Sequence, residues 1–142
     1  MKKKVYPLHY AGKKQRFARS VAVGEFLFLS GSSGRTIETG EVSSNDVVEQ
    51  TRVALDKIRL ALEEAGSGLE HIVKMTIYLK NMSDYQAMRD AEFQYYQKYC
   101  PALVKDPPAS TVVQVVSLSK PNMLAEFDAI AVLPEVHEPK QS

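Results

Sequence analysis

The chain has 142 residues, and 18 Lys and Arg against 17 Asp and Glu give it a formal net charge of +1. This length is typical of one domain with a hydrophobic core of its own. The near-zero net charge argues against a dedicated nucleic-acid binder. No apolar stretch approaches the ~20 residues that a membrane span needs. We therefore expect a single cytoplasmic domain with neither a nucleic acid nor a membrane as partner.

Cysteine and histidine are scarce: the chain holds Cys100 and three histidines, His9, His71 and His137. One cysteine cannot form an intramolecular disulfide, and a zinc site built from Cys and His needs about four ligands at tight spacing. The sequence thus predicts neither a metal site nor a cofactor.

The N-terminal part predicts an irregular segment followed by a hairpin. Residues 1–17 are polar and basic, which favours an irregular lead-in. From Ser20 to Ser30 apolar residues alternate on both sides of Gly24-Glu25, as in two paired strands. A two-residue turn that begins with Gly indicates type II′, because Gly tolerates a positive φ.

The middle of the chain predicts two helices and a strand. Asp46 is expected to cap the first helix, with Glu49 completing a capping box and Gly66 ending the helix. Residues 72–79 alternate between polar and apolar side chains and indicate a strand with one buried face. A second helix is expected from Ser83 or Asp84 to about Tyr99, before Pro101.

The C-terminal part predicts a loop over residues 103–108, strands over 110–118 and 124–133, and a polar tail over 134–142. The order ββ-α-β-α-ββ predicts an α+β domain spanning residues 1–142, with a mixed sheet and two helices on one face. Because the other face stays partly apolar, we expect it to meet another subunit.

Glu126 and Asp128 lie two residues apart in an otherwise apolar strand, so they share one face. A buried carboxylate costs several kcal/mol unless it is paired or hydrated. Two interpretations remain open. The acids lie on a solvated face or sheet edge, or they line a cleft that holds a water molecule or a substrate.

Six sequence pieces share their order with one known family. They are Gly24–Gly31 (GEFLFLSG), Gln50–Arg52 (QTR), Ala61–Gly66 (ALEEAG), Val73–Leu79 (VKMTIYL), Pro108–Ala109 (PA) and Glu126–Ala131 (EFDAIA). Together they resemble the Rid (YjgF) family of reactive-intermediate deaminases. The resemblance covers residues 20–133. It implies a chorismate-mutase-like fold and a homotrimer with a ligand cleft at each subunit interface.

The resemblance also implies a reaction, the hydrolysis of 2-imino or 2-enamino acids to 2-oxo acids and ammonia. It assigns Glu126 to positioning the attacking water. Backbone groups near Ser30 and Gly31 would hold the imine nitrogen. Substrate binding would also involve the residues after Pro108-Ala109, namely Ser110, Thr111 and Val112.

Two positions depart from the family pattern. Ser110 stands where the family has an arginine that binds the substrate carboxylate, and Phe17 stands where a tyrosine is common. Losing a charged hydrogen-bonding partner costs ~1.5–3 kcal/mol. Arg89 or Arg35 is therefore a candidate for the missing guanidinium. In the alternative, Arg89 pairs with Glu92 or Glu126 on the surface.

Three functions stay open. The first is an enamine or imine deaminase, in which Ser110 and Thr111 donate neutral hydrogen bonds. The second is a non-catalytic module that binds a small metabolite or regulates a partner, which the missing Arg and Tyr favour. The third is an endoribonuclease or translation inhibitor, as some relatives are named. The sequence offers neither a histidine pair for RNA cleavage nor a basic stripe.

Overall fold

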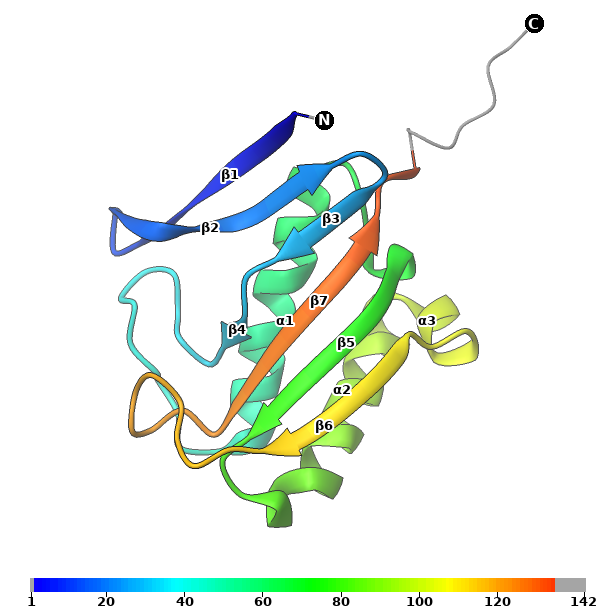
Figure 1. Ribbon diagram of the computed structural model, residues 1–142. Coiled ribbons are helices and arrows are strands. Elements are labelled where there is room, and N and C mark those ends of the chain that lie inside the picture. The colour runs from blue at the N-terminus through cyan, green and yellow to red at the C-terminus, as the bar shows by residue number, and fades with distance from the viewer. Residues whose placement is uncertain (1, 135–142) are drawn as a thin grey trace, which may run out of the picture.

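Two helices cover one face of a mixed sheet in the computed structural model, which describes residues 2–134 (Figure 1). The helices are α1 (Val47–Glu64) and α2 (Tyr85–Tyr99). The seven-stranded sheet has the order β1-β2-β3-β7-β5-β6, with the short β4 also paired to β7. The strands are β1 (Lys3–Tyr10), β2 (Lys13–Val23), β3 (Phe26–Leu29), β4 (Ser32–Ser33), β5 (Ile72–Leu79), β6 (Ala109–Gln114) and β7 (Ala125–Val132). The expected α+β domain with helices on one face is confirmed.

Among the described strands only β5 and β6 pair in parallel, and α2 connects them across the helical face. The other strand pairs are antiparallel. The hairpin between β2 and β3 is confirmed. Its turn has Gly24 at a φ of 58°, and Glu25 does not adopt a positive φ, as a type II′ turn requires.

Helix α1 begins as the sequence predicts, although its capping differs in one respect. The Asp46 carboxylate accepts a hydrogen bond from the Val48 amide at 3.3 Å. Glu49, however, does not return to the cap, because its carboxylate pairs with Arg52. The predicted capping box is therefore wrong in its second half. Gly66 follows the helix with a φ of 84°, a conformation that glycine adopts at little cost.

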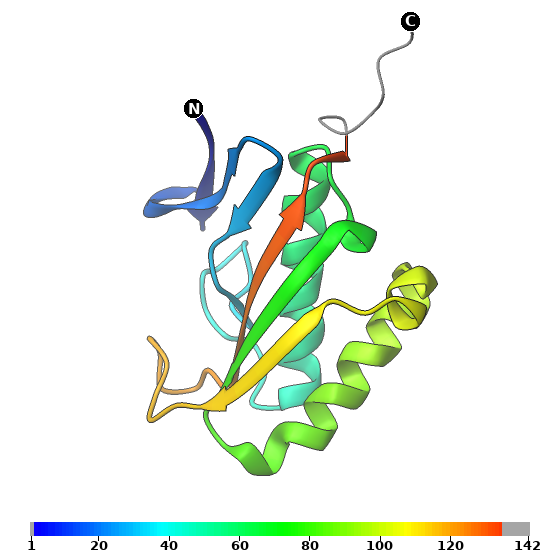
Figure 2. The same ribbon diagram turned by 45° about the vertical axis from the view of Figure 1, so that its right-hand side comes forward.

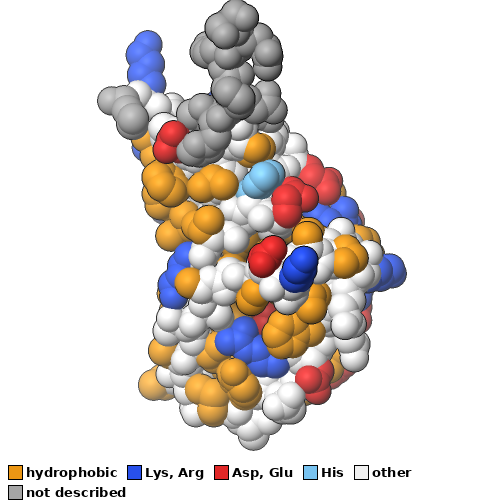
Figure 3. Space-filling model, turned by 90° about the vertical axis from the view of Figure 1, so that its right-hand side faces the viewer, with side chains coloured by type: hydrophobic (Ala, Val, Ile, Leu, Met, Phe, Trp, Pro, Cys, Tyr) orange, Lys and Arg blue, Asp and Glu red, His pale blue; other side chains and the backbone are white. Residues whose placement is uncertain are grey.

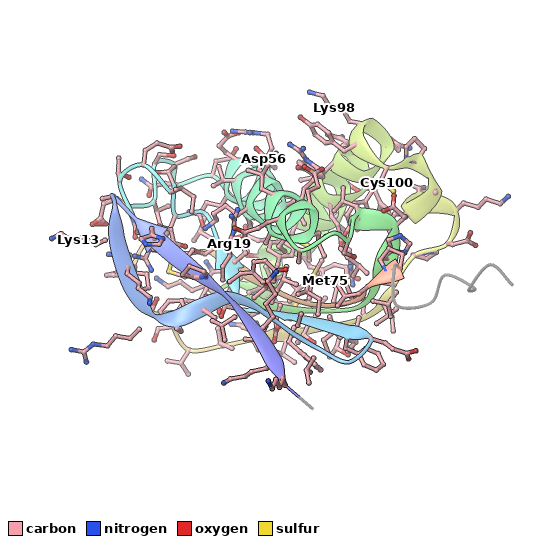
Figure 4. All side chains as sticks on the ribbon, turned by 90° about the horizontal axis from the view of Figure 1, so that it is seen from above. Lys13, Arg19, Asp56, Met75, Lys98 and Cys100 are labelled. Carbon is pink, nitrogen blue, oxygen red and sulfur yellow. The ribbon has the colours of Figure 1, made fainter. Side chains whose placement is uncertain are left out.

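The core lies between the sheet and the helices. Ala125, Phe127 and Ala129 of β7 are buried against that side, and β5 contributes Met75 and Ile77. Figure 4 views this arrangement from above, with α1 and α2 on one side of the sheet. Along β7 each buried residue alternates with a half-buried one, so Glu126 and Asp128 share the opposite face. The predicted common face of the two acids is confirmed.

The lead-in predicted over residues 1–17 is wrong. Strand β1 pairs with β2 from Lys3 opposite Val23 to Tyr10 opposite Lys13. The turn between them has positive φ angles at Ala11 (51°) and Gly12 (76°), as in a type I′ turn. The sequence hides this hairpin because Ala is a poor marker of such a turn. The lysines and Pro7 suit β1 because it is an edge strand.

The segment after α2 also differs from expectation. Residues 101–105 form a short helix, α3 (Pro101–Lys105), where the first half of a loop over 103–108 was expected. Pro101 begins α3 because the first turn of a helix needs no amide donor there. Strand β6 ends at Gln114 instead of Leu118. Of the predicted polar tail, only Pro134 lies within the described residues.

The face of the sheet that the helices leave open carries a cluster of apolar side chains. We call it the open-face patch, and it comprises Val5, Val21, Val23, Phe26, Phe28, Ile130 and Val132, which neighbour one another through the strand registers. Phe26 and Phe28 are more than 40% exposed. Figure 3 views the molecule from the side of β6, so that the open face lies along the left edge, where hydrophobic side chains gather.

Candidate functional site

A cleft of about 640 Å³ lies where the β1–β2 hairpin, the start of β4 and the β6–β7 loop meet. Four of the residues that the family resemblance assigned line it: Phe17, Ser30, Gly31 and Glu126. Arg35, one of the two candidate guanidinium donors, lines it as well. Tyr10 and Ser33 complete its inner wall, and Ser117, Leu118, Ser119 and Met123 form the wall from the β6–β7 loop.

A β-bulge opens the sheet beside Glu126. Phe28 pairs with Ile130 and Ser32 pairs with Phe127, so four steps along one chain span three along β7. The extra residue displaces the Ser30-Gly31 segment from regular pairing. A Cβ at Gly31 would overlap the Glu126 carboxylate. A side chain at position 31 would therefore displace the Glu126 carboxylate, which lies directly against the Gly31 backbone.

Ser30 is fixed by the neighbouring strand. Its hydroxyl donates to the Ala18 carbonyl at 2.5 Å, and its amide donates to the Arg19 carbonyl at 3.1 Å. Both hydrogens of Ser30 are thus engaged with β2. Ser30 positions Gly31 and does not itself offer a free donor to a ligand.

The Glu126 carboxyl has a raised pKa. Burial is the main cause, and the like charge of Asp128 adds to it, while Lys57 and Arg35 oppose it. A carboxylate with a raised pKa is a stronger base than an exposed one. Glu126 thus combines a position in the cleft with the basicity needed to accept a proton from water.

Gln50 of α1 holds together two loops that adjoin the cleft. Its side-chain amide donates to the carbonyls of Ser44 (2.7 Å) and Asn122 (2.9 Å). Its carbonyl accepts from the Leu124 amide at 2.8 Å. Gln50 is buried, and a Cβ at Gly34 would collide with it. These contacts fix the loop after β4 and the loop before β7 to the same helix.

Arg35 lies in the cleft with its guanidinium stacked on Tyr10, the Cζ atom 4.0 Å from the ring centroid. Its Nε donates to the Gly40 carbonyl at 2.7 Å. Within residues 2–134 no carboxylate forms an ion pair with it, and neither Nη nitrogen has a hydrogen-bond partner. The guanidinium is therefore held in place by one edge while its two terminal nitrogens stay open to a ligand.

Lys57 of α1 lies beneath Tyr10, on the side of a small cavity of about 30 Å³. This cavity and the cleft share Tyr10, Ser30 and Gly31 as walls, and its volume suffices for one or two water molecules. Lys57 is only 8% exposed, and its Nζ donates to the Tyr10 hydroxyl at 3.2 Å. Burial and the nearby charges of Arg35 and Arg19 lower the pKa of Lys57 to about 7, and Glu126 opposes this shift.

Arg89 lies elsewhere, and its guanidinium is fully engaged. Nη1 pairs with the Glu92 carboxylate at 2.8 Å, Nη2 donates to the Ser110 hydroxyl at 3.0 Å, and Nε donates to the Tyr85 hydroxyl at 3.1 Å. The expected alternative, a pair between Arg89 and Glu92, is confirmed. Glu92 is buried rather than on the surface, so removing Arg89 would leave an uncompensated charge.

The residues after Pro108-Ala109 are also remote from the cleft within one chain. Ser110 pairs with Met75, and Met75 pairs with Ala129, three residues beyond Glu126. Two strand spacings and three residues correspond to about 14 Å. Thr111 faces the open side and accepts a hydrogen bond from Lys74, while Val112 packs on the core. Within one chain the predicted site residues thus fall into two separate groups. One lines the cleft around Glu126, and the other lies around Ser110 on β6.

The sequence did not identify Tyr10 or Lys57 as candidates. Tyr10 lies in the segment that the sequence predicts to be irregular. The Lys57 side chain is not apolar, so the helical spacing of apolar residues does not predict that it is buried. Spacing did offer one signal. Lys57 lies between the core positions Leu55 and Ile58, and a lysine at that place on a helix faces inward at its edge.

Residues 2–134 contain no group of three or more His, Cys, Asp and Glu side chains placed to hold a metal ion. Among residues 2–134, every helix is too short or too polar to cross a membrane.

Comparison with known proteins places this chain in a family. The family model described as Endoribonuclease L-PSP matches residues 11–133. The chain belongs to this family, the Rid (YjgF) proteins. The match covers every residue that lines the cleft except Tyr10, which comes directly before it.

Individual Rid relatives resemble the chain over most of its length. A RutC family protein from Pyrococcus abyssi is 35% identical over 81% of this chain and 84% of its own. A 2-iminobutanoate/2-iminopropanoate deaminase from Capra hircus is 31% identical over 82% of this chain and 79% of its own. The crystal structure of Escherichia coli TdcF with bound serine has a TM-score of 0.79 at 27% identity. The alignment covers 92% of this chain and 98% of TdcF.

The buried amine of Lys57 makes the stability of this Rid protein depend on pH. Its folded-state pKa of about 7 lies below the ordinary 10.5, so the unfolded chain binds more protons between these values. Stability therefore rises with pH in that window. We expect the free energy of unfolding of the wild type, relative to Lys57→Met, to increase by about 2 kcal/mol from pH 7 to pH 9.

Urea unfolding of both proteins at the two pH values measures this difference. Other titrating groups are common to both chains and cancel. At pH 7 the methionine variant should be the more stable protein, because it buries no charge. An unfolding difference that stays the same at pH 7 and pH 9 would contradict a lowered pKa for Lys57.

Proposed function

We propose that this Rid protein hydrolyses 2-imino acids, or their enamine tautomers, to 2-oxo acids and ammonia in the cleft around Glu126. The observation that carries the proposal is that one cleft holds both a partly buried carboxylate and a guanidinium that forms no ion pair within residues 2–134. A 2-imino acid needs one group to activate water and another to bind its carboxylate. Glu126 and Arg35 supply these two groups.

Glu126 acts as the general base. It accepts a proton from water as the water oxygen bonds to the imine carbon, and its raised pKa improves it for this task. The Gly31 backbone lies against the same carboxylate, so a ligand held there places its reacting carbon beside Glu126. The role that the family resemblance implies for Glu126, positioning the attacking water, is consistent with this position.

Arg35 replaces the family arginine whose position Ser110 occupies. Its planar guanidinium, stacked on Tyr10, presents both Nη nitrogens to a carboxylate, which suits a bidentate pair. Arg89 is a poorer candidate because all three of its nitrogens are bonded within the chain. Two relatives support a substrate with a carboxylate: the Capra hircus protein is named for 2-imino acids, and the TdcF structure holds serine.

We also propose that the protein assembles as a homotrimer through the open face. The open-face patch leaves Phe26 and Phe28 more than 40% exposed, which is costly for a monomer. The same assembly would bring a neighbour's Ser110 and Thr111 to the cleft, which they do not reach within one chain. The family resemblance implies this arrangement, and the division of the predicted site into two groups supports it.

Replacing Glu126 tests the proposed base. Glu126→Gln keeps the shape of the side chain and removes its charge, so we expect kcat to fall by ~10²–10⁴-fold. The assay follows 2-oxo acid formation from 2-iminopropanoate that an amino-acid oxidase generates in situ, above the uncatalysed rate.

Asp128→Asn is the matched control, because Asp128 shares the strand and the face of Glu126 but does not line the cleft. It should stay within about threefold of the wild type. A wild-type rate no higher than buffer would contradict deamination. If a 2-oxo acid then still raised the melting temperature, the cleft would be a binding site without turnover.

The identity of the residue that binds the substrate carboxylate gives a second prediction. Arg35→Ala should raise KM by about 10–100-fold, since a charged hydrogen-bonding partner contributes ~1.5–3 kcal/mol. The comparison variant is Arg89→Ala/Glu92→Gln, which removes both charges of the buried pair together and leaves none uncompensated. A rise in KM confined to the double variant would instead assign binding of the substrate carboxylate to Arg89.

The assembly gives a third prediction. Light scattering should find three chains per particle for the wild type and one for Phe28→Lys, which places a charge in the open-face patch. Phe93→Lys is the matched control, because Phe93 is as exposed as Phe28 but lies on α2. A monomeric wild type, or dissociation caused by Phe93→Lys alone, would contradict the proposed interface.

A further inference from the structure

Tyr10 places a phenol in the cleft, although the position where the Rid family commonly has tyrosine holds Phe17. Tyr10 and Phe17 both line the cleft, from β1 and β2. Tyr10 is only 7% exposed, and the stacked Arg35 guanidinium covers its ring. The phenol is therefore held in one orientation near Gly31 and Glu126.

The hydroxyl of Tyr10 has a specific partner in Lys57. Nζ of Lys57 donates to it at 3.2 Å, which occupies a lone pair of the oxygen and leaves the phenolic hydrogen free to point elsewhere. This is the only hydrogen bond of Nζ within residues 2–134, and no carboxylate there forms an ion pair with it. A buried ammonium with a single hydroxyl partner is costly, and stability does not explain its presence.

The groups around Lys57 come from four elements. Tyr10 approaches from β1, Arg19 from β2, Arg35 from the segment after β4, and Glu126 from β7. Arg19 is itself paired with Glu64 at 3.5 Å. Two cations thus oppose the ammonium and one carboxylate favours it, so Lys57 gives up its proton more readily than an exposed lysine.

We propose that Tyr10 is the general acid of the cleft and that Lys57 resupplies its proton through their hydrogen bond. The inference rests on the proposed imine hydrolysis, to which it adds the proton donor that the reaction requires. Tyr10 would contact the substrate nitrogen. Lys57 acts through Tyr10 and is a positioning and proton-supplying residue.

The protons balance over two steps. In the first step the water oxygen bonds to the imine carbon, and Glu126 takes one proton of the water. The nitrogen takes the Tyr10 proton, and Tyr10 takes one from Lys57, which gives a carbinolamine. In the second step Glu126 returns its proton to the nitrogen, and the C–N bond breaks to release ammonia. The carbinolamine hydroxyl passes its proton through Tyr10 back to Lys57, and the 2-oxo acid remains.

This cycle requires Glu126 ionised and Lys57 protonated at the start. Activity should therefore rise with pH as Glu126 loses its proton and fall again as Lys57 loses its own, near about pH 7. A purely structural lysine would give no such alkaline limb.

The test measures kcat with 2-iminopropanoate between pH 5.5 and 9 for the wild type and four variants. Tyr10→Phe removes only the hydroxyl and should lower kcat by ~10²-fold, whereas Tyr6→Phe on the same strand should not. Lys57→Met should lower kcat and abolish the alkaline limb. Lys57→Arg keeps a positive charge beside Tyr10 but does not release its proton in this range, so it should lower kcat and lose the alkaline limb as Lys57→Met does.

Failure of the two proposals can be told apart. If Glu126→Gln loses activity while Tyr10→Phe keeps the wild-type kcat, the deaminase stands and the proton relay is wrong. The relay is also wrong if both Lys57 variants keep the wild-type alkaline limb. A wild type without turnover overturns both. Circular dichroism and melting curves of each variant exclude misfolding as the cause of a lost rate.

Discussion

The site depends on how β7 pairs with the chain beside it. β7 is bonded to β3 over one stretch and to β4 over the next, and one extra residue separates the two stretches. That bulge places Gly31 where the Glu126 side chain lies against it. Without the break, the ladder would continue past Glu126 and the carboxylate would lie on an unbroken sheet. The cleft is therefore a consequence of strand register.

The surrounding elements keep this break open. Ser32 bonds to α1 through the Ala54 carbonyl at 2.8 Å, and Ser30 bonds to the backbone of β2. Gln50 fastens the two adjoining loops to the same helix. The β1–β2 hairpin then folds over the gap and joins the loop after β4, where the Ala11 amide donates to the Ile37 carbonyl at 2.9 Å. Figure 2 shows this hairpin curling away from the main sheet.

Periodicity predicted the elements that bury a continuous apolar face. Strand β5 has the predicted bounds, and α1 begins at the predicted cap, since Asp46 and the repeating aliphatic residues act locally. The β1–β2 hairpin was missed because Ala11 is a poor marker of its tight turn and because its strands are rich in basic residues. Glu126, Ser30 and Gly31 were identifiable through the resemblance. Tyr10 and Lys57 were not, because only the folded hairpin brings β1 over α1.

Under the proposed function, the site keeps the chemistry of the family although two of its groups come from other positions. Arg35 would supply the guanidinium that Ser110 lacks, and Tyr10 would supply the hydroxyl that Phe17 lacks. Tyr10 comes from β1 and Arg35 from the segment after β4, and the two side chains stack on each other. Arg89 does not line this cleft. It pairs with the buried Glu92 and donates a hydrogen bond to Ser110, so it joins α2 to β6.

The most direct measurement is a crystal structure of the protein with 2-oxobutanoate, the stable analogue and product of the proposed reaction. We expect its carboxylate within hydrogen-bond distance of both Nη nitrogens of Arg35. Its carbonyl oxygen, which stands in for the imine nitrogen, should face the Tyr10 hydroxyl, with its carbonyl carbon beside Glu126. A ligand bound outside this cleft, or a carboxylate held by a guanidinium other than Arg35, would contradict the account.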